Sequence, residues 1–267
     1  MNKENYIVYL LLCLFLLSCS TTKNLPEGAI LYTGISKMEI QQPDNSEAGR
    51  STVEEVEAAL AYPPNNAFMG SSSVRVPFPF GLWVYNAFVN KEGKLSRWIF
   101  NKLAAKPVLI STVNPDVRVK VARNLLNEYG YFNGATAYEL VPDKKDPRKA
   151  KIAYQVTMNP PYTIDSVYYV RMRNRVDSLL PRMSSERLLR KGDNFNVVRL
   201  QAERERIADM LRDHGYYYFR PEYMVYQADT TITPGKVSLR VVPKEGMPRN
   251  ALRPWKLGKV DFYLNGY

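Results

Sequence analysis

The chain has 267 residues and a formal net charge of +11, with 37 Lys and Arg residues against 26 Asp and Glu residues. This basic balance favours an acidic partner, such as anionic lipid, acidic polypeptide or nucleic acid. A single histidine, His214, excludes metal sites built from paired histidines.

The N-terminal residues have the pattern of a secretion signal. Lys3 precedes an apolar run, residues 6–17, that is too short to span a bilayer comfortably. The run leads into Ser18 and Cys19, which resembles a bacterial lipobox, where the thiol of a cysteine after a small residue takes the lipid. We therefore expect a signal peptide over residues 1–18, lipid attachment at Cys19 and a tether over residues 19–28. The alternative is an ordinary signal peptide followed by an incidental cysteine.

Removal of this signal peptide would discard Cys13 and leave Cys19 as the single cysteine of the mature chain. One cysteine forms no intramolecular disulfide and no cysteine metal cluster. Export also argues against nucleic acid as the partner of the basic charge.

Residues 29–159 indicate a first folded unit that contains an insertion. The pattern predicts a strand over residues 31–40 and a short helix over residues 53–61, capped by Ser51 or Thr52. An insertion of about residues 62–110 follows, rich in Pro and aromatic residues, with a basic amphipathic piece over residues 95–103. An aromatic insertion can be a contact surface. We favour the alternative, in which it folds back on the first unit as local core.

A helix followed by a Gly-aromatic-aromatic corner then occurs twice, with the corner glycines 85 residues apart. In the first copy Asn114 is the predicted N-cap, Pro115 takes the first helical position and Gly130 ends the helix. In the second copy Asn196 is the cap and Gly215 the terminator. Both glycines are expected in the left-handed conformation, because the end of a helix commonly requires it.

Three features of these helices carry further expectations. Val117, Val121 and Leu125 recur every four residues and predict the buried stripe of the first helix. The charge run from Glu203 to Arg206 indicates a solvated face rather than a site. His214, at the end of the second helix, is interpreted as a capping residue rather than a catalytic one.

Two runs of alternating apolar and polar residues follow each corner and predict two strands. Tyr138 and Leu140 lie eight and ten residues after the first corner glycine, and Tyr223 and Val225 lie at the same offsets after the second. This shared phase predicts that the same face is buried in both units. The partner strands have apolar residues at alternate positions: Ile152, Tyr154, Val156, Met158, Val237, Leu239 and Val241.

A second unit is expected over residues 160–245, with a strand at 163–170 and a short helix at 184–189 before the second long helix. Residues 246–267 are interpreted as a linker and the first strand, from residue 257 on, of an incomplete third unit. The repeating order is strand, short helix, long helix, strand, strand. It predicts an α+β fold of tandem units, each a three-stranded mixed sheet with two helices on one face.

The sequence contains no pattern that indicates catalysis. There is no HExxH or P-loop spacing, and no serine has an evident base and orienting partner. We therefore predict no enzyme activity, no catalytic residue, no metal site and no cofactor.

The unit order and size resemble those of POTRA domains. Several segments, taken in order, resemble the N-terminal part of BamA/TamA-type outer-membrane assembly proteins of Bacteroidetes: the lipobox, Leu25-Pro26-Glu27-Gly28, Tyr32-Thr33-Gly34, Trp83-Val84-Tyr85-Asn86 and residues 202–207. That family normally continues into a transmembrane β-barrel. The alternating segments here are few and belong to the repeats, so the resemblance implies a chain truncated before the barrel.

The resemblance implies a periplasmic binding module that is anchored to the outer membrane by lipid. Its implied partners are unfolded outer-membrane proteins or subunits of an assembly complex, held by β-strand addition, a mode that makes little demand on sequence. The alternative is a periplasmic lipoprotein that binds glycan or cell wall through some of its 19 tyrosines. Tyrosines at strand starts and in inward phases favour core packing over this alternative.

The strand after the second corner is the predicted docking edge. Tyr223 and Val225 are expected to face the helices, while Met224 and Tyr226 are expected to face solvent. Lys236 and Arg240 on the neighbouring strand would attract acidic segments. The alternative is that another unit or the aromatic insertion covers this edge. The candidate edge residues are Glu222, Tyr223, Met224, Val225, Tyr226, Gln227 and Ala228.

Overall fold

The computed structural model describes residues 21–263 apart from 73 and 173, and its chain divides into two compact units. Unit 1 comprises Met1–Asn124 and Ala135–Thr157, and unit 2 comprises Leu125–Gly134 and Met158–Tyr267. The predicted signal peptide and Cys19 lie outside the described residues. No helix within the described ranges combines the length and the apolar character needed to cross a bilayer.

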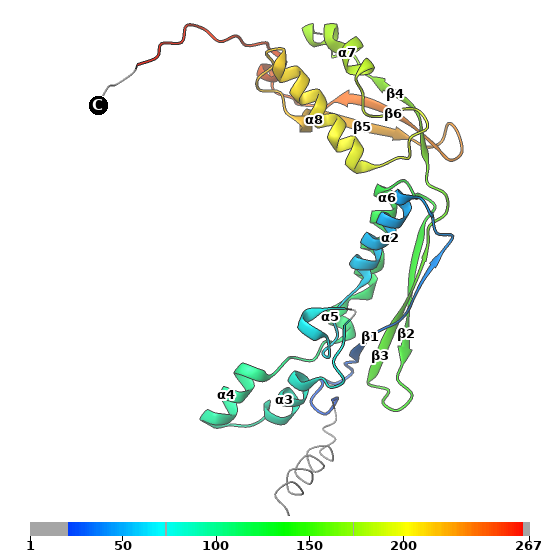
Figure 1. Ribbon diagram of the computed structural model, residues 1–267, viewed down its shortest axis with the longest axis vertical. Helices are drawn as coiled ribbons and strands as arrows, with labels where there is room; N and C mark the ends of the chain where they lie inside the picture. The colour runs from blue at the N-terminus through cyan, green and yellow to red at the C-terminus, as the bar shows by residue number, and fades with distance from the viewer. Residues whose placement is uncertain (1–20, 73, 173, 264–267) are drawn as a thin grey trace, which may run out of the picture. The chain divides into compact units, whose positions relative to one another are not determined.

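Unit 1 is built on a mixed sheet of β1 (Leu31–Gln41), β2 (Ala135–Pro142) and β3 (Lys149–Thr157). The order is β1-β3-β2, with β1 parallel and β2 antiparallel to the central strand. Helices α2 (Glu47–Leu60) and α6 (Pro115–Glu128) cover one face of it (Figure 1). The predicted α+β architecture is confirmed in this unit.

Helix α2 begins six residues earlier than the sequence pattern predicts. Its N-cap is Ser46, whose Oγ accepts a hydrogen bond from Gly49 N–H at 3.0 Å. Thr52, one of the two predicted caps, is instead buried within the helix, and its hydroxyl donates to the carbonyl of Ala48. Residues 47–52 therefore belong to the first turns of the helix, not to a loop, with Glu47, Arg50 and Ser51 on its exposed side.

The buried stripe of α6 is also displaced from the predicted one. Val117 and Val121 are 50% and 44% exposed, whereas Ala122 and Leu126 are fully buried. Arg118 lies on the buried side, where Nη1 donates to the carbonyls of Ala59 and Ala61 at the end of α2. The sequence pattern did not predict this buried stripe, because the periodicity counts only apolar side chains and Arg118 is charged.

The insertion forms a helical hairpin, followed by an extended segment and a short helix. The hairpin comprises α3 (Phe80–Phe88) and α4 (Lys94–Leu103), and α5 (Ile110–Val113) follows. Residues just before α5 run beside β1, where Tyr32 N–H donates to Val108 O at 2.8 Å. Helix α3 buries Leu82 and Val84, whereas no residue of α4 is buried. The insertion thus contributes local core through α3 and leaves α4 as exposed surface.

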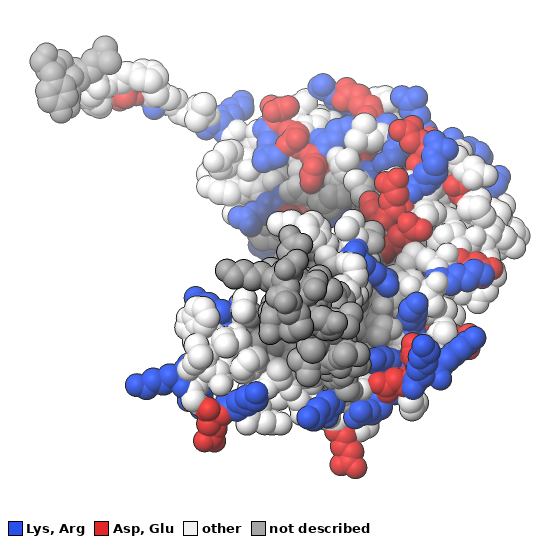
Figure 2. Space-filling view, turned by 60° about the horizontal axis from the view of Figure 1, so that its bottom comes forward, with Lys and Arg blue, Asp and Glu red and all other residues white. Residues whose placement is uncertain are grey.

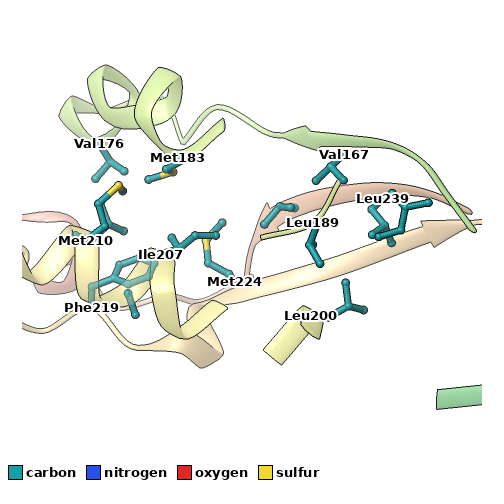
Figure 3. Packing of buried hydrophobic residues seen from close by; sticks show 14 of the residues in the cluster. Val167, Val176, Met183, Leu189, Leu200, Ile207, Met210, Phe219, Met224 and Leu239 are labelled. Carbon is teal, nitrogen blue, oxygen red and sulfur yellow. The ribbon is translucent and has the colours of Figure 1, made fainter. Parts of the chain in front are cut away.

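Unit 2 repeats the plan with β4 (Thr163–Tyr169), β5 (Met224–Asp229) and β6 (Lys236–Pro243) in the order β4-β6-β5. Its helices are α7 (Leu180–Ser185) and α8 (Val197–Asp213). Their apolar faces and the sheet enclose the core shown in Figure 3, which includes Met183, Ile207 and Leu239. The short helix predicted at 184–189 lies four residues earlier, with Pro181 in its first turn and Glu186 at its C-cap.

The predicted caps and corners of the long helices are confirmed. The Oδ1 atom of Asn196 accepts from Val198 N–H at 2.8 Å, and the Oδ1 atom of Asn114 accepts from Val117 N–H at 3.4 Å at the start of α6. Gly130 and Gly215 have φ values of +87° and +90°, in the left-handed region. Each corner carbonyl also accepts a backbone hydrogen bond, from Tyr162 N–H and Trp255 N–H respectively.

The strand predicted from residue 257 on is not formed. Residues 249–252 make a 3-10 turn, and residues 254–263 have no regular secondary structure. Leu257 and Phe262 are 94% and 88% exposed. A strand needs a neighbour for its backbone groups, and no other strand of the described chain pairs with this segment.

Candidate peptide-docking edge

Strand β5 forms one edge of the sheet of unit 2. Within the described residues it pairs only with β6, in antiparallel register. The strand begins at Met224, so Glu222 and Tyr223 of the predicted edge lie instead in a 3-10 turn, Pro221–Tyr223. The remaining predicted edge residues, Met224 to Ala228, belong to the strand.

The side chains of β5 point in the opposite phase to the predicted one. Met224 is 1% exposed in the core, and Tyr226 reaches α8, where its hydroxyl donates to Leu200 O at 2.9 Å. Val225 is 37% exposed on the outer face of the sheet. The 3-10 turn between corner and strand shifts the phase by one residue. In unit 1 β2 starts at Ala135 without such a turn, and Tyr138 packs inward as predicted.

The register shows which backbone groups of β5 point away from β6. Lys244 N–H donates to Tyr223 O at 2.8 Å, so these two residues form a hydrogen-bonded pair. Such pairs alternate with non-hydrogen-bonded pairs along an antiparallel ladder. The backbone groups of Met224, Tyr226 and Ala228 therefore point to the free edge. Pro243, which has no N–H, lies opposite Met224, where the ladder requires none.

One of the outward donors is already used, because Met224 N–H donates to Pro221 O in the 3-10 turn. The edge then offers the N–H groups of Tyr226 and Ala228, and the carbonyls of Met224, Tyr226 and Ala228. This alternation of donors and acceptors is what an added antiparallel or parallel strand requires.

The outer edges of β1 and β4 are partly covered, in contrast to β5. Beside β1, Ile110 N–H donates to Ile30 O at 2.9 Å. Beside β4, Ile164 N–H donates to Asp193 O and its carbonyl accepts from Gly192 N–H, both at 2.8 Å. In unit 1, β2 also lies at an edge of its sheet and pairs only with β3 among the described strands. Asp143 N–H donates to Lys149 O, so the same alternation of inward and outward backbone groups holds along β2.

Basic side chains lie near the β5 edge, as predicted. Lys236 and Arg240 of β6 are exposed, and Arg240 pairs across the ladder with exposed Gln227. Figure 2 shows Lys and Arg side chains spread over the visible surface with Asp and Glu between them. The basic charge is therefore distributed over this view and is not gathered in one field.

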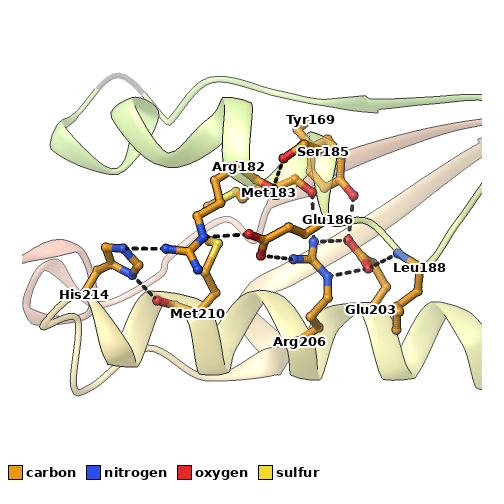
Figure 4. A network of polar contacts seen from close by, with 10 residues as sticks. All are labelled: Tyr169, Arg182, Met183, Ser185, Glu186, Leu188, Glu203, Arg206, Met210 and His214. Atoms are coloured by element: carbon orange, nitrogen blue, oxygen red, sulfur yellow. Dashed lines mark hydrogen bonds and ion pairs between the residues drawn. The ribbon is translucent and has the colours of Figure 1, made fainter.

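Glu203 corrects the interpretation of residues 203–206 as a solvated face. It lies in α8 and its side chain is fully buried. It accepts hydrogen bonds from Tyr169 Oη at 2.6 Å, Leu188 N–H at 2.9 Å and Arg206 Nη2 at 2.6 Å (Figure 4). Burial and the bond to Glu203 raise the pKa of the Tyr169 hydroxyl, and the bond to Glu203 raises the pKa of Arg206.

This buried carboxylate connects α8 to β4 and to the loop after α7. Each of its oxygens accepts hydrogen bonds from groups within the fold. A buried charge held in this way is structural, because an unpaired one would be strongly destabilising. Sequence periodicity missed it because it occupies an inward position of the helix within a charge run.

A hollow of about 540 Å³ lies between α7 and α8, lined by charges of both signs that include Arg182, Glu186 and Asp209. At its rim His214 Nδ1 lies 2.7 Å from Met210 O, and Nε2 lies 3.4 Å from Arg182 Nη1. Both ring nitrogens are thus engaged at the helix end. No group of three or more His, Cys, Asp or Glu residues in the described ranges is placed to hold a metal ion.

An exposed aromatic cluster surrounds the second corner. Tyr217 and Tyr218 are 70% and 45% exposed, and the Tyr218 and Trp255 ring centroids lie 5.4 Å apart. Arg253 lies over the Trp255 ring, and the cluster borders a hollow of about 350 Å³. The corner motif is the sequence signal for this cluster, although by itself the motif predicts only the end of a helix.

Comparisons with known proteins gave similarities to solved structures alone. No protein-family model matches the chain, and no curated protein matches it. The chain is similar to BamA POTRA3-5 of Haemophilus influenzae, with 10% identity over 84% of this chain and 70% of that one and a TM-score of 0.39.

Two further similarities involve related structures. For Omp85 POTRA1-2 of Anabaena the identity is 14%, over 82% of this chain and 98% of that one, and the TM-score is 0.32. For BamA of Haemophilus ducreyi lacking POTRA domains 1-3 the identity is 13%, over 61% of this chain and 27% of that one, and the TM-score is 0.34. This chain thus spans about a quarter of the length of that one. At these TM-scores, the function has to be argued from the residues of the chain itself.

Proposed function

We propose that this chain is a periplasmic binding module of an outer-membrane protein assembly factor, anchored by lipid at Cys19. It holds unfolded outer-membrane proteins or partner subunits by β-strand addition to β5. The POTRA-like order of elements and the segments that resemble outer-membrane assembly proteins support the class of function.

The observation that carries the proposal is the free edge of β5. The N–H groups of Tyr226 and Ala228 and the carbonyls of Met224, Tyr226 and Ala228 point outward, and no strand of the described residues pairs with them. An exposed edge of this kind is normally an aggregation hazard. Retaining it is consistent with temporary pairing to extended clients, for which backbone hydrogen bonds supply affinity without a sequence requirement.

Site-specific photo-crosslinking tests the docking edge. A photoreactive residue at Gln227, exposed on β5, should crosslink to an unfolded outer-membrane protein. The matched control position is Glu205, exposed on α8. Met224 is not a suitable position, because its side chain is in the core. Equal crosslinking at positions 227 and 205, or none at 227, would contradict docking at this edge.

The glycan-binding alternative has one specific observation in its favour, the exposed cluster of Tyr217, Tyr218 and Trp255. Aromatic faces beside arginines can stack on sugar rings. The buried tyrosines Tyr32, Tyr131, Tyr154 and Tyr216 serve the core and weaken the broader argument from tyrosine content. Binding to purified cell wall that is abolished by Trp255→Ala, together with absent crosslinking at position 227, would favour the alternative.

A further inference from the structure

Helix α4 has an apolar face that its own hairpin does not cover. Phe100 packs on Tyr85 of α3, with ring centroids 5.7 Å apart. Leu95 and Trp98, three residues apart and hence on one side of the helix, are 72% and 58% exposed. At the start of α3, Phe80 is 60% exposed as well.

The hairpin is also strongly basic. Residues 91–106 contain five basic residues against one acidic residue, Glu92. Lys91 lies with Nζ 5.0 Å from the ring centroid of Phe88. Exposed Trp and Leu beside Lys and Arg are typical of helices that lie in the interface of an anionic membrane. The basic residues are Lys91, Lys94, Arg97, Lys102 and Lys106.

The first described residues of the chain are fixed to this hairpin. Asn24 N–H donates to Asn86 Oδ1 at 3.2 Å, and Asn24 Nδ2 donates to Asn86 O at 2.9 Å. Asn86 Nδ2 in turn donates to Thr21 O at 3.2 Å. Thr22 is 1% exposed, and its hydroxyl donates to Asp146. The start of the described chain therefore lies against α3 (Figure 1), whereas the sequence predicts a tether over residues 19–28.

We propose that the α3–α4 hairpin is a membrane-docking surface, which lies on the anionic phospholipid leaflet that holds the lipid of the chain. This inference rests on the proposed lipid attachment at Cys19. Cys19 is two residues before Thr21, and two residues span at most about 7 Å. Lipid at Cys19 therefore brings α3 close to the phospholipid headgroups.

Docking then places Leu95 and Trp98 at the level of the acyl chain boundary and leaves the lysine ammonium groups among the headgroup phosphates. Long basic side chains can reach the headgroups while their stems cover apolar surface. The hairpin thus gives the anchor a second contact with the membrane, and a basic patch beside a lipid chain strengthens attachment to anionic phospholipid.

Tryptophan fluorescence of the lipidated full chain tests this surface. Trp83→Phe and Trp255→Phe leave Trp98 as the single tryptophan, and the chain is reconstituted in vesicles of phosphatidylethanolamine and phosphatidylglycerol. Trp98 emission should shift to shorter wavelength and should be quenched by lipids brominated on their acyl chains. In the matched control, Trp98→Phe with Val117→Trp moves the reporter to exposed α6, where no quenching is expected.

The outcomes distinguish membrane docking by the hairpin from lipid attachment at Cys19. Mass spectrometry that finds lipid on Cys19, together with unquenched Trp98, would overturn the hairpin proposal and leave the anchor intact. If Cys19 is unmodified, flotation of the Cys19→Ser chain with the same vesicles tests the hairpin alone. Leu95→Ser with Trp98→Ser should then reduce binding roughly tenfold, and Val117→Ser with Val121→Ser should not. Absent binding, or an equal loss in both pairs, would overturn it. Crosslinking at position 227 is independent of these results.

Discussion

The corner glycine Gly215 is constrained in two ways, whereas some other left-handed glycines of the chain are constrained in only one. Gly215 has a φ of +90°, and a Cβ atom there would lie 2.8 Å from the carbonyl oxygen of Trp255. Gly192 has a φ of +91°, but a Cβ atom there would have nothing within 4 Å. Comparing the two positions separates backbone conformation from close contact.

We expect Gly192→Ala to lower the free energy of unfolding by about 1 kcal/mol, the cost of the left-handed conformation. Gly215→Ala should lower it by about 2–3 kcal/mol, because the Trp255 carbonyl must also move. Urea unfolding of both variants measures the difference. Equal losses would show that the contact with Trp255 does not constrain the corner.

Glu203 is a second residue whose role is structural. Glu203→Ala should lower the free energy of unfolding by about 3 kcal/mol, because Arg206 and the Tyr169 hydroxyl lose their buried partner. Glu205→Ala, exposed on the same helix, should change it by no more than about 0.5 kcal/mol. Similar melting temperatures for the two variants would contradict the assigned burial of Glu203.

At the scale of elements, the sequence predicts best where local chemistry decides. Asn196 and Gly215 identify both ends of α8, because a cap and a left-handed terminator act within one turn. The phase of β5 could not be predicted, because the 3-10 turn before it inserts a residue that alternation does not reveal. The exposure of the apolar face of α4 could not be predicted either, because periodicity identifies an apolar face but not whether another element packs on it.

The direction of each backbone N–H group along β5 predicts how a proline at that position acts. Ala228→Pro removes an outward N–H on an exposed residue, so it should weaken client crosslinking roughly fivefold and change stability by less than about 1 kcal/mol. Gln227→Pro removes an N–H that bonds to β6, so it should destabilise unit 2 by about 2–3 kcal/mol.

Crosslinking from position 225 and urea unfolding measure both effects. Unchanged crosslinking in Ala228→Pro would show that the outward N–H groups do not hold the client. A large loss of stability in that variant would show instead that the edge is already covered.

For the molecule as a whole, the net charge of +11 becomes zero near the isoelectric point of about 9.5. Solubility should pass through a minimum there, because electrostatic repulsion between copies is lost. Just above this pH, the buried tyrosines add a separate effect. Burial raises the pKa of Tyr32 and Tyr154 in unit 1 from 10.0 to about 12, and it also raises the pKa of Tyr169 and Tyr226 in unit 2.

These shifts give alkaline unfolding a definite sign. A folded-state pKa above the unfolded value means that the unfolded chain loses its proton first, so stability falls as pH rises. For Tyr32 and Tyr154 the loss begins at about pH 10 and is complete near about pH 12. Urea unfolding at a series of pH values should show this decline in unit 1. Tyr154→Phe should make it shallower, because that ring is 2% exposed and its hydroxyl has no hydrogen-bond partner in the described residues. An unchanged pH profile in Tyr154→Phe would contradict the assignment.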